Sequence, residues 1–424
     1  MAVCVVILVS SCKKDFGNLN NATVQDFAAN ATEGELNNLA SGTESGMRTN
    51  LALYLDDVGT IGRELYHFSI SEPRYVTDLL GANAATLSNS NFYITNPWAS
   101  RYQVIKNCNV LIQAATNSKS ITAAQRSGYL GFARTIKAYQ LLLLLNLTDS
   151  NGVRIDVADP DHLGPLVQPA DALAAISALL DSAKSDLGGA TVAFTLAGFG
   201  GFSDAPGLLK VNRALAARVD VYRQNWSAAL TDLSQSFFGL QVPFGAGVYH
   251  VFGTGSGDQL NTFFIPQNQT GEVRVAHPSF AADISAGDDR IGKATLRQSV
   301  ASLNGLSSNR DVWVYTTSTT PVPIIRNEEL ILIYAEANIQ LLDLPDAVVA
   351  LNAIRVAHNL GPYAGAVSKS ALLTEMLNQR RYSLYCEGHR WVDLRRYGLL
   401  SQLPIDRVGD DVWTEFPIPV SEQP

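Results

Sequence analysis

Residues 379–398 read QRRYSLYCEGHRWVDLRRYG, a stretch dense in charged and aromatic side chains. Within it, Leu384, Gly388 and Trp391 follow one another at helical spacing. This spacing predicts a single helix over the whole stretch, with Gly398 as its end. A glycine inside a helix costs about 1 kcal/mol relative to alanine, so Gly388 indicates that another backbone approaches closely there. We therefore expect other elements to cover the apolar face of this helix.

Three polar residues of the stretch, Glu387, His389 and Asp393, allow two interpretations. His389 and Asp393 lie four residues apart and so share a helix face, as they would in a catalytic or metal site. Acids and arginines at turn spacing also form ion pairs that hold a helix against its neighbours. The several arginines beside these acids favour the second, architectural interpretation.

The order Glu-Gly-His-Arg-Trp-x-Asp-Leu-Arg-Arg at 387–396 resembles the C-terminal signature of the SusD/RagB-like family, which comprises surface lipoproteins of nutrient uptake in Bacteroidetes-type bacteria. In that family the signature is architectural. The resemblance thus implies a structural role for Glu387, Gly388, His389, Arg390, Trp391 and Asp393. Segments at 211–222, 326–361 and 416–422 also resemble the family, in the family's order.

The overall composition is that of a globular protein. The 424 residues, 46% hydrophobic and 17% charged, are enough for one large domain or two ordinary ones. A net charge of -8 without a run of Lys or Arg argues against a nucleic-acid partner, whose phosphates need a basic surface. The cysteines form no Cys-x-x-Cys or Cys/His cluster, so we expect no metal, no cofactor and no disulfide framework. Cys108 and Cys386 are expected to be buried and free.

Residues 1–11, MAVCVVILVSS, predict a lipoprotein signal peptide. The apolar run is too short to cross a bilayer as a helix, which takes about 20 apolar residues. It lacks a basic segment at its beginning, so we expect the true start to lie upstream. The end of the run, LVSSC, resembles the lipobox of bacterial lipoproteins, in which the cysteine takes a diacylglycerol and the preceding peptide is removed. Cys12 is therefore the expected lipidation site and first residue of the mature chain, anchored by its acyl groups.

Helix, polar break and helix recur along the chain, near 98–146, 211–238 and 324–360. In the first of these stretches, Thr122 and Gln125 predict a capping box at the start of the second helix. Such pairs are typical of tetratricopeptide (TPR) repeats, whose period is about 34 residues and which bury their apolar faces only by stacking. With the family resemblance, this predicts a mainly α fold: a stack of TPR-like helix pairs (an α-α superhelix) with a loop-rich, small-strand ligand-binding face. One SusD-like domain is expected over 12–424.

Two long inserts, 63–97 and 239–323, lose the helical period and contain much Gly, Ser, Asn and Pro. We predict an irregular excursion for the first insert, and short strands joined by long loops for the second. Long loops in a compact protein are often functional. The acidic run Asp288-Asp289-Arg290 fits a turn with a local ion pair better than the acid pair of a glycosidase.

Aromatic residues of these inserts are the candidate ligand-binding set, namely Tyr66, Tyr75, Tyr93, Trp313 and Tyr315. Sugar recognition needs exposed flat faces for the C–H sides of pyranose rings, with amides or charged groups beside them for the hydroxyls. Polar residues such as Arg74, Asn91 and Asp311 lie close by in the sequence. The alternative is that half or more of these rings belong to the core.

The resemblance implies a non-catalytic lipoprotein, anchored at the outer membrane and facing the exterior. It would bind oligosaccharide or another nutrient and deliver it to a TonB-dependent, SusC-like transporter. A TPR-type adaptor lipoprotein that binds proteins is the alternative. It would need a concave helical groove exposed over several repeats, whereas long ordered inserts favour ligand capture. A hydrolase that uses Glu387, His389 and Asp393, or Asp288 and Asp289, is a third hypothesis.

Overall fold

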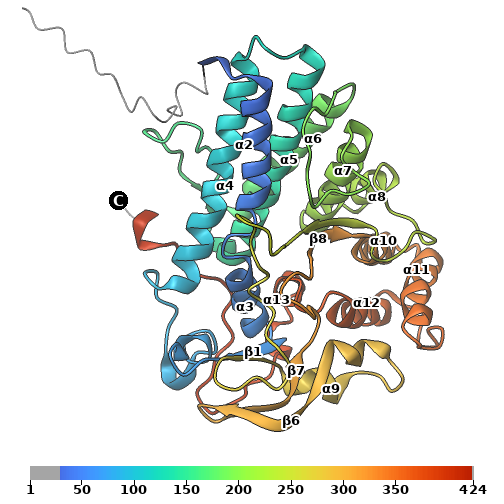
Figure 1. Cartoon of the computed structure of the whole chain (residues 1–424). Helices are drawn as coiled ribbons and strands as arrows, with labels where there is room; N and C mark the ends of the chain where they lie inside the picture. Colours follow the sequence, from blue (N-terminus) through green and yellow to red (C-terminus); the bar gives the residue numbers. More distant parts are fainter. Residues whose placement is uncertain (1–28, 423–424) are drawn as a thin grey trace, which may run out of the picture.

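The computed structural model describes residues 29–422, and helices dominate it (Figure 1). The α-helices are α2 (Glu33–Gly46), α3 (Leu51–Ile61), α4 (Phe92–Asn117), α5 (Ala123–Thr148), α6 (Pro169–Leu187), α7 (Ala205–Tyr222), α8 (Trp226–Ser234), α9 (Pro278–Asp283), α10 (Asn327–Leu341), α11 (Leu344–Ala357), α12 (Lys369–Ser383) and α13 (Arg390–Arg396). Successive helices pack on one another from α4 to α8, and α8 then packs on α10, which also contacts α11 and α12. The predicted stack of TPR-like helix pairs is confirmed. The predicted signal peptide, 1–11, and Cys12 lie outside the described residues.

The sequence of helix α5 explains where this helix begins and how closely its neighbours pack on it. Its capping box is present as predicted, because Gln125 N donates to Thr122 Oγ1 at 3.2 Å and Thr122 N donates to Gln125 Oε1 at 2.8 Å. From Gly128 onward nearly every residue is buried, since α4 and α6 cover both sides. A Cβ at Gly131 would lie 2.5 Å from Leu187 Cγ, so α5 and α6 can approach this closely only with glycine there.

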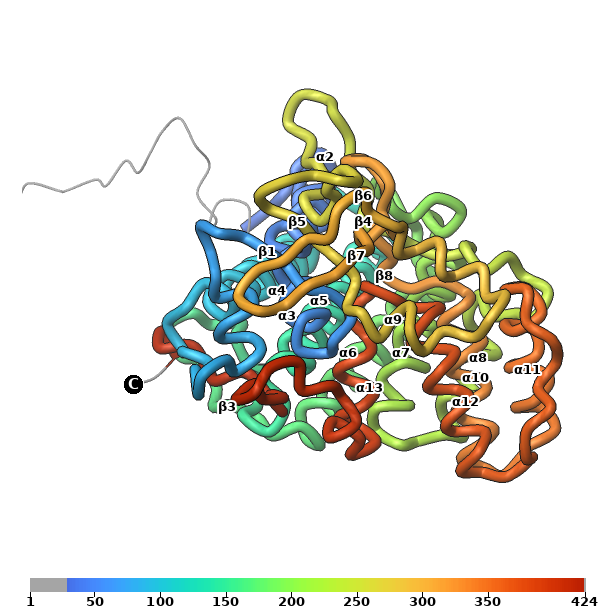
Figure 2. The backbone as a smooth tube through the Cα atoms, turned by 90° about the horizontal axis from the view of Figure 1, so that it is seen from below, coloured from blue at the N-terminus to red at the C-terminus, as the bar shows by residue number. Residues whose placement is uncertain are grey.

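The strands are short and lie mostly in the second insert. They are β1 (Leu65–Phe68), β2 (Val153–Arg154), β3 (Leu166–Val167), β4 (Gly247–His250), β5 (Val273–Ala276), β6 (Ala294–Leu303), β7 (Leu306–Val312) and β8 (Val322–Arg326). Four of them form an antiparallel sheet in the order β1-β5-β7-β6, with Leu65 opposite Ala276. Figure 2 shows this sheet on one side of the helix stack. The sheet joins the first insert to the second.

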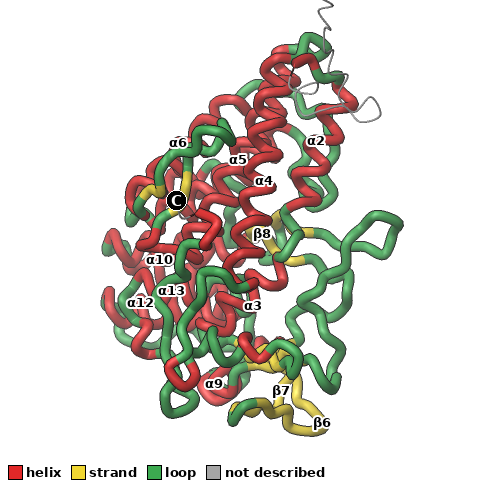
Figure 3. The backbone as a smooth tube through the Cα atoms, turned by 90° about the vertical axis from the view of Figure 1, so that its left-hand side faces the viewer, coloured by secondary structure: helices red, strands yellow, loops and turns green. Residues whose placement is uncertain are grey.

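The inserts differ in part from their predicted form. The first insert contains β1, and α4 begins inside it, at Phe92 rather than Trp98. The second insert forms short strands joined by long loops, as expected, together with the short helix α9. In Figure 3 the helices fill one side of the molecule and a long run of loop projects on the other. We call the surface that the inserts 63–97 and 239–323 present the loop face.

The main hydrophobic core runs through the helix stack, with a second cluster among α10, α11 and α12 and a third beneath the sheet. Cys108 and Cys386 are buried and free, as expected from their spacing. Within residues 29–422, no helix combines the length and apolarity needed to cross a bilayer.

Candidate functional site

The signature stretch is two helices joined by a tight turn, so the prediction of one helix over 379–398 is wrong. Helix α12 ends at Ser383 and α13 begins at Arg390. In the turn, Cys386 has a φ of 58° and Gly388 a φ of 86°, which a continuing helix does not permit. A Cβ at Gly388 would lie 3.2 Å from Tyr54 Cε1, so a side chain of α3, rather than a backbone, makes the close approach.

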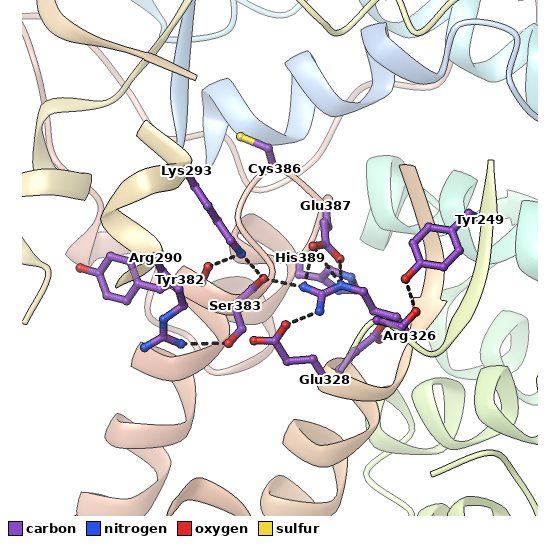
Figure 4. A network of polar contacts seen from close by, with 12 residues as sticks. Tyr249, Arg290, Lys293, Arg326, Glu328, Tyr382, Ser383, Cys386, Glu387 and His389 are labelled. Carbon is purple, nitrogen blue, oxygen red and sulfur yellow. Dashed lines mark hydrogen bonds and ion pairs between the residues drawn. The ribbon is translucent and has the colours of Figure 1, made fainter. Parts of the chain in front are cut away.

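Glu387 is held by an arginine at the end of β8 (Figure 4). Arg326 Nη2 donates to Glu387 Oε1 at 2.8 Å, and Arg326 Nε donates to Glu387 Oε2 at 3.2 Å. Arg326 also pairs with Glu328 and donates to the carbonyl of Ser383 at 2.7 Å. All three ionic side chains are at least 90% buried, so the network fixes the turn against β8 and α10.

Two further cations satisfy the C-terminal end of α12, where a helix leaves carbonyl oxygens unpaired. Lys293 Nζ donates to the carbonyls of Tyr382 at 2.8 Å and Ser383 at 2.6 Å. Arg290 Nη1 donates to Ser383 Oγ at 2.9 Å, while its Nη2 pairs with Asp288 at 2.7 Å. The ion pair predicted for the Asp288 turn is thus present, and it supports the signature.

Asp393 and His389 are buried among arginines. Burial opposes ionisation of Asp393, but contacts with Arg380 Nε at 2.6 Å and Arg396 Nη2 at 2.8 Å hold its pKa at about 2. Burial lowers the pKa of His389 to about 4, against the opposing pull of Glu329. The partners of these two residues are the ion-pair partners that the architectural interpretation expects. The described residues contain no group of three or more His, Cys, Asp or Glu that could hold a metal ion.

The remaining signature residues are also packed. Trp391 is fully buried and donates from Nε1 to the carbonyl of Trp413 at 2.8 Å. Arg390 donates from Nε to the carbonyl of Gly62 at 3.1 Å, and burial lowers the pKa of its guanidinium to about 10. These bonds join α13 to the end of α3 and to the C-terminal segment.

Three of the five candidate rings lie in the core, so their expected exposure is wrong. Tyr66 stacks on Phe68 within β1 and is 2% exposed. Tyr93 is fully buried, and its hydroxyl donates to Asp78 at 3.1 Å. Tyr315 donates to the carbonyl of Cys386 at 3.1 Å. Each ring fills space beneath an insert and satisfies its hydroxyl inside the protein, which is the core alternative noted above.

The other two rings, Tyr75 and Trp313, are half-buried on the loop face. Tyr75 stacks on His67 with centroids 4.0 Å apart and meets Phe92 edge-on at 5.2 Å. Trp313 lies against Phe264, with centroids 6.1 Å apart. Both positions keep part of a ring accessible beside the polar side chains of the inserts.

A charged cluster that includes His67 lies next to Tyr75, and it was not predicted from the sequence. His67 Nδ1 and Nε2 each lie 3.1 Å from a carboxylate oxygen, of Asp56 and Glu272 respectively, and Glu272 is 58% exposed. Arg274 Nε contacts Asp56 at 2.6 Å. Burial opposes ionisation of Asp56, but Arg274 and His67 hold its pKa at about 2, whereas burial and Asp56 raise the pKa of Asp57 well above its usual range. The one sequence signal was an arginine inside the apolar run of β5.

A separate cavity of about 250 Å³ lies between the ends of β1 and β5 and the edge strand β6, and neither Tyr75 nor Trp313 lines it. Ile70, Gln269, Arg297 and Val300 are among its lining residues, and they present apolar groups, an amide and a guanidinium. Arg274 also donates to the carbonyls of Thr262 and Phe263, which ties this region to the loop that carries Phe264. The loop face therefore carries two half-buried rings, a charged cluster and a cavity that the rings do not line.

Residues 266–413, which contain the signature and the strands β5 to β8, match the model of the SusD family. Over these residues the chain is similar to the SusD family. No curated protein matches this SusD-like chain. Solved structures similar to it include surface glycan-binding protein A from Bacteroides thetaiotaomicron in complex with laminarihexaose, with a TM-score of 0.71 and 13% identity over 92% of this chain and 97% of that one.

Two further structures are similar to the SusD-like chain. A SusD superfamily protein from Bacteroides vulgatus has a TM-score of 0.69 and 17% identity over 94% of this chain and 96% of that one. Surface glycan-binding protein A from Bacteroides uniformis has a TM-score of 0.66 and 15% identity, covering 88% of this chain and 90% of that one. At these identities the likeness establishes the shared fold.

Proposed function

We propose that this SusD-like protein binds oligosaccharides at the cell surface without chemically changing them. The observation that carries the proposal is the shared fold with a surface glycan-binding protein that was solved with laminarihexaose. The loop face supports it, because the half-buried Tyr75 stacks there on His67, which in turn contacts the exposed Glu272. We place ligand binding at Tyr75 and Trp313, with Glu272 as a hydrogen-bond acceptor for sugar hydroxyls.

The proposal includes the route by which the ligand leaves. The protein is anchored through acylated Cys12 in the outer membrane, faces the exterior, and passes oligosaccharide to a TonB-dependent, SusC-like transporter. The family match supports this route. Cells that lack the protein should fail to accumulate labelled oligosaccharide at concentrations below the Kd of the wild-type protein. Undiminished accumulation would exclude the delivery role.

The signature contacts support a non-catalytic role. Hydrolysis of glycosides needs a carboxylic acid and a second carboxylate that face the substrate. Glu387, Asp393 and Asp288 instead face arginines at hydrogen-bond distance inside the protein.

The packing of the helix pairs also favours capture over the adaptor hypothesis. Helix α10 is buried along most of its length by α7, α8, α11 and α12, and α5 is buried by α4 and α6. These central helices leave little of their inner faces for a protein partner, whereas the inserts are long and ordered on the outside.

Isothermal titration with a panel of neutral and acidic oligosaccharides tests the proposal. Tyr75→Ala and Trp313→Ala should each weaken binding about tenfold or more while far-UV circular dichroism is unchanged. Tyr363, a half-buried tyrosine between α11 and α12, provides the matched control, and Tyr363→Ala should bind like wild type. Wild-type affinity in both folded loop-face variants would show that the site lies elsewhere, and a wild type that binds no oligosaccharide would refute the function.

A further inference from the structure

A larger cavity, of about 430 Å³, is lined by residues of α5, α6, α7, α8, α10 and α13. Its wall includes Asn146, Tyr222, Gln224, Trp226, Gln340 and Tyr397. None of its lining residues comes from the inserts 63–97 and 239–323, so it is separate from the loop face. Its volume falls within the range of about 300 to 1,000 Å³ that is usual for sites of small ligands. We call it the helix-side pocket.

Three aromatic rings line the helix-side pocket, and all three are half-buried. Arg396 covers one face of Tyr222, with its guanidinium carbon 4.8 Å from the ring centroid, and lies 5.4 Å from the centroid of Tyr397. Trp226 stands at the first position of α8, next to the turn that follows α7. The pocket is therefore lined by the flat apolar faces of three aromatic rings, Tyr222, Trp226 and Tyr397.

Several polar groups of this wall have no partner in the protein. In the described part of the chain, neither the Tyr222 hydroxyl, nor the Gln224 amide, nor Trp226 Nε1 makes a hydrogen bond to another residue. Gln340 keeps one bond, from Nε2 to the Tyr397 hydroxyl at 3.2 Å. Donors and acceptors beside ring faces are the combination that a sugar ring satisfies, through its hydroxyls and its C–H face.

The charges around the pocket are already neutralised. Arg396 pairs with Glu336 at 2.9 Å and with Asp393 at 2.8 Å. Arg395 lies 3.3 Å from Asp149 and also donates to two backbone carbonyls. Because both guanidinium groups are paired with carboxylates, the wall has little net charge to attract an anionic ligand. The polar groups of the wall that have no partner in the protein are neutral.

We propose that the helix-side pocket is a second carbohydrate-binding site, which takes a neutral pyranose unit. The ring packs against Trp226 and Tyr222, and its hydroxyls bond to the Gln224 amide and the Tyr222 hydroxyl. The assignment rests on the proposed function, because it assumes that the natural ligand is a glycan. Two sites on one molecule raise the avidity for a long or branched glycan that reaches both.

Titration with neutral hexasaccharides, of β-1,3-, β-1,4- and α-1,4-linked glucose, tests the pocket. Wild type should show two sites, and Trp226→Ala should lose one of them, with the loop-face site unchanged. Gln224→Ala and Tyr222→Phe should weaken the same site about tenfold, which a purely structural role would not do, because Gln224 is exposed and the Phe variant keeps the ring. Trp226→Phe should also lose part of the ligand-induced change in tryptophan fluorescence.

The outcomes separate this inference from the proposed function. If Gln224→Ala, Tyr222→Phe and Trp226→Phe are folded and bind as wild type does, the pocket is not a sugar site, although the loop face retains its function. Binding of acidic glycans alone overturns the neutral-sugar assignment and leaves the proposed function intact. If wild type binds no glycan at all, both fall.

Discussion

Replacing Glu387 by alanine removes a carboxylate that two nitrogen atoms of Arg326 contact at 2.8 and 3.2 Å. Glu387 is 6% exposed and Arg326 10% exposed, so solvent screens the pair little. Breaking a buried ion pair commonly costs about 3 to 5 kcal/mol, because the remaining charge stays buried without a partner. Arg326 keeps Glu328 and the Ser383 carbonyl as partners, which lowers the expected cost to about 1 to 3 kcal/mol.

Urea unfolding at equilibrium measures this loss, and a thermal melt should show a decrease in Tm of roughly 1 to 4 °C for a chain of this size. The pair between Glu72 and Arg74 is the matched control, since its atoms are 2.6 Å apart, at least as close as those of Glu387 and Arg326, but its side chains are 24% and 41% exposed. Glu72→Ala should cost less than about 1 kcal/mol. If Glu387→Ala costs no more than the control, or abolishes a hydrolytic activity with stability intact, the architectural interpretation of the signature is wrong.

Three other outcomes are expected. Gly388→Ala should destabilise the protein by about 1 to 3 kcal/mol, because φ is positive and Tyr54 lies in the way, whereas Gly398→Ala, with a similar φ and open space, should cost less in the same urea titration. The folded pKa of His389 is about 4 against an ordinary value of 6.5, so the unfolded state takes up its proton first as pH falls. Stability should thus drop by roughly 2 kcal/mol from pH 7 to pH 5, and less in His389→Asn; equal losses in the two proteins would contradict this. A fatty-acid analogue should label wild type but not Cys12→Ser, and label on the serine variant would rule out lipidation at this residue.

Helix pairs could be predicted from the sequence because their signals are local. The apolar periodicity of α5 and its Thr122 and Gln125 cap are contained in one segment of chain. The turn at Gly388 was missed for the opposite reason. Apolar residues continue at helical spacing across it, and only the left-handed backbone at Cys386 and Gly388, together with Tyr54 from α3, shows that the helix has ended.

The candidate site was harder to predict, because exposure depends on packing between distant segments. Tyr66, Tyr93 and Tyr315 stand among polar neighbours in the sequence, as ligand-binding rings do. All three are nevertheless buried, Tyr66 in the cluster beneath the sheet and Tyr93 and Tyr315 in the main core. Conversely, the helix-side pocket draws Trp226 and Tyr397 from elements that no local pattern connects. Periodicity marks which residues are in helices, but it does not indicate which helix ends meet.

The sheet that joins the two inserts governs how the chain can fold. Arg274 on β5 binds Asp56, which is 218 residues earlier, and Arg63 donates to the carbonyl of Asp411, 348 residues later. Closing such distances costs chain entropy before any contact repays it, so folding should be slow and concerted. During synthesis the N-terminal helices emerge first. The strand β1 and the carboxylate of Asp56 find their partners only when β5, which carries Arg274, has been made. We therefore expect the chain to stay incompletely folded until most of its length has been made.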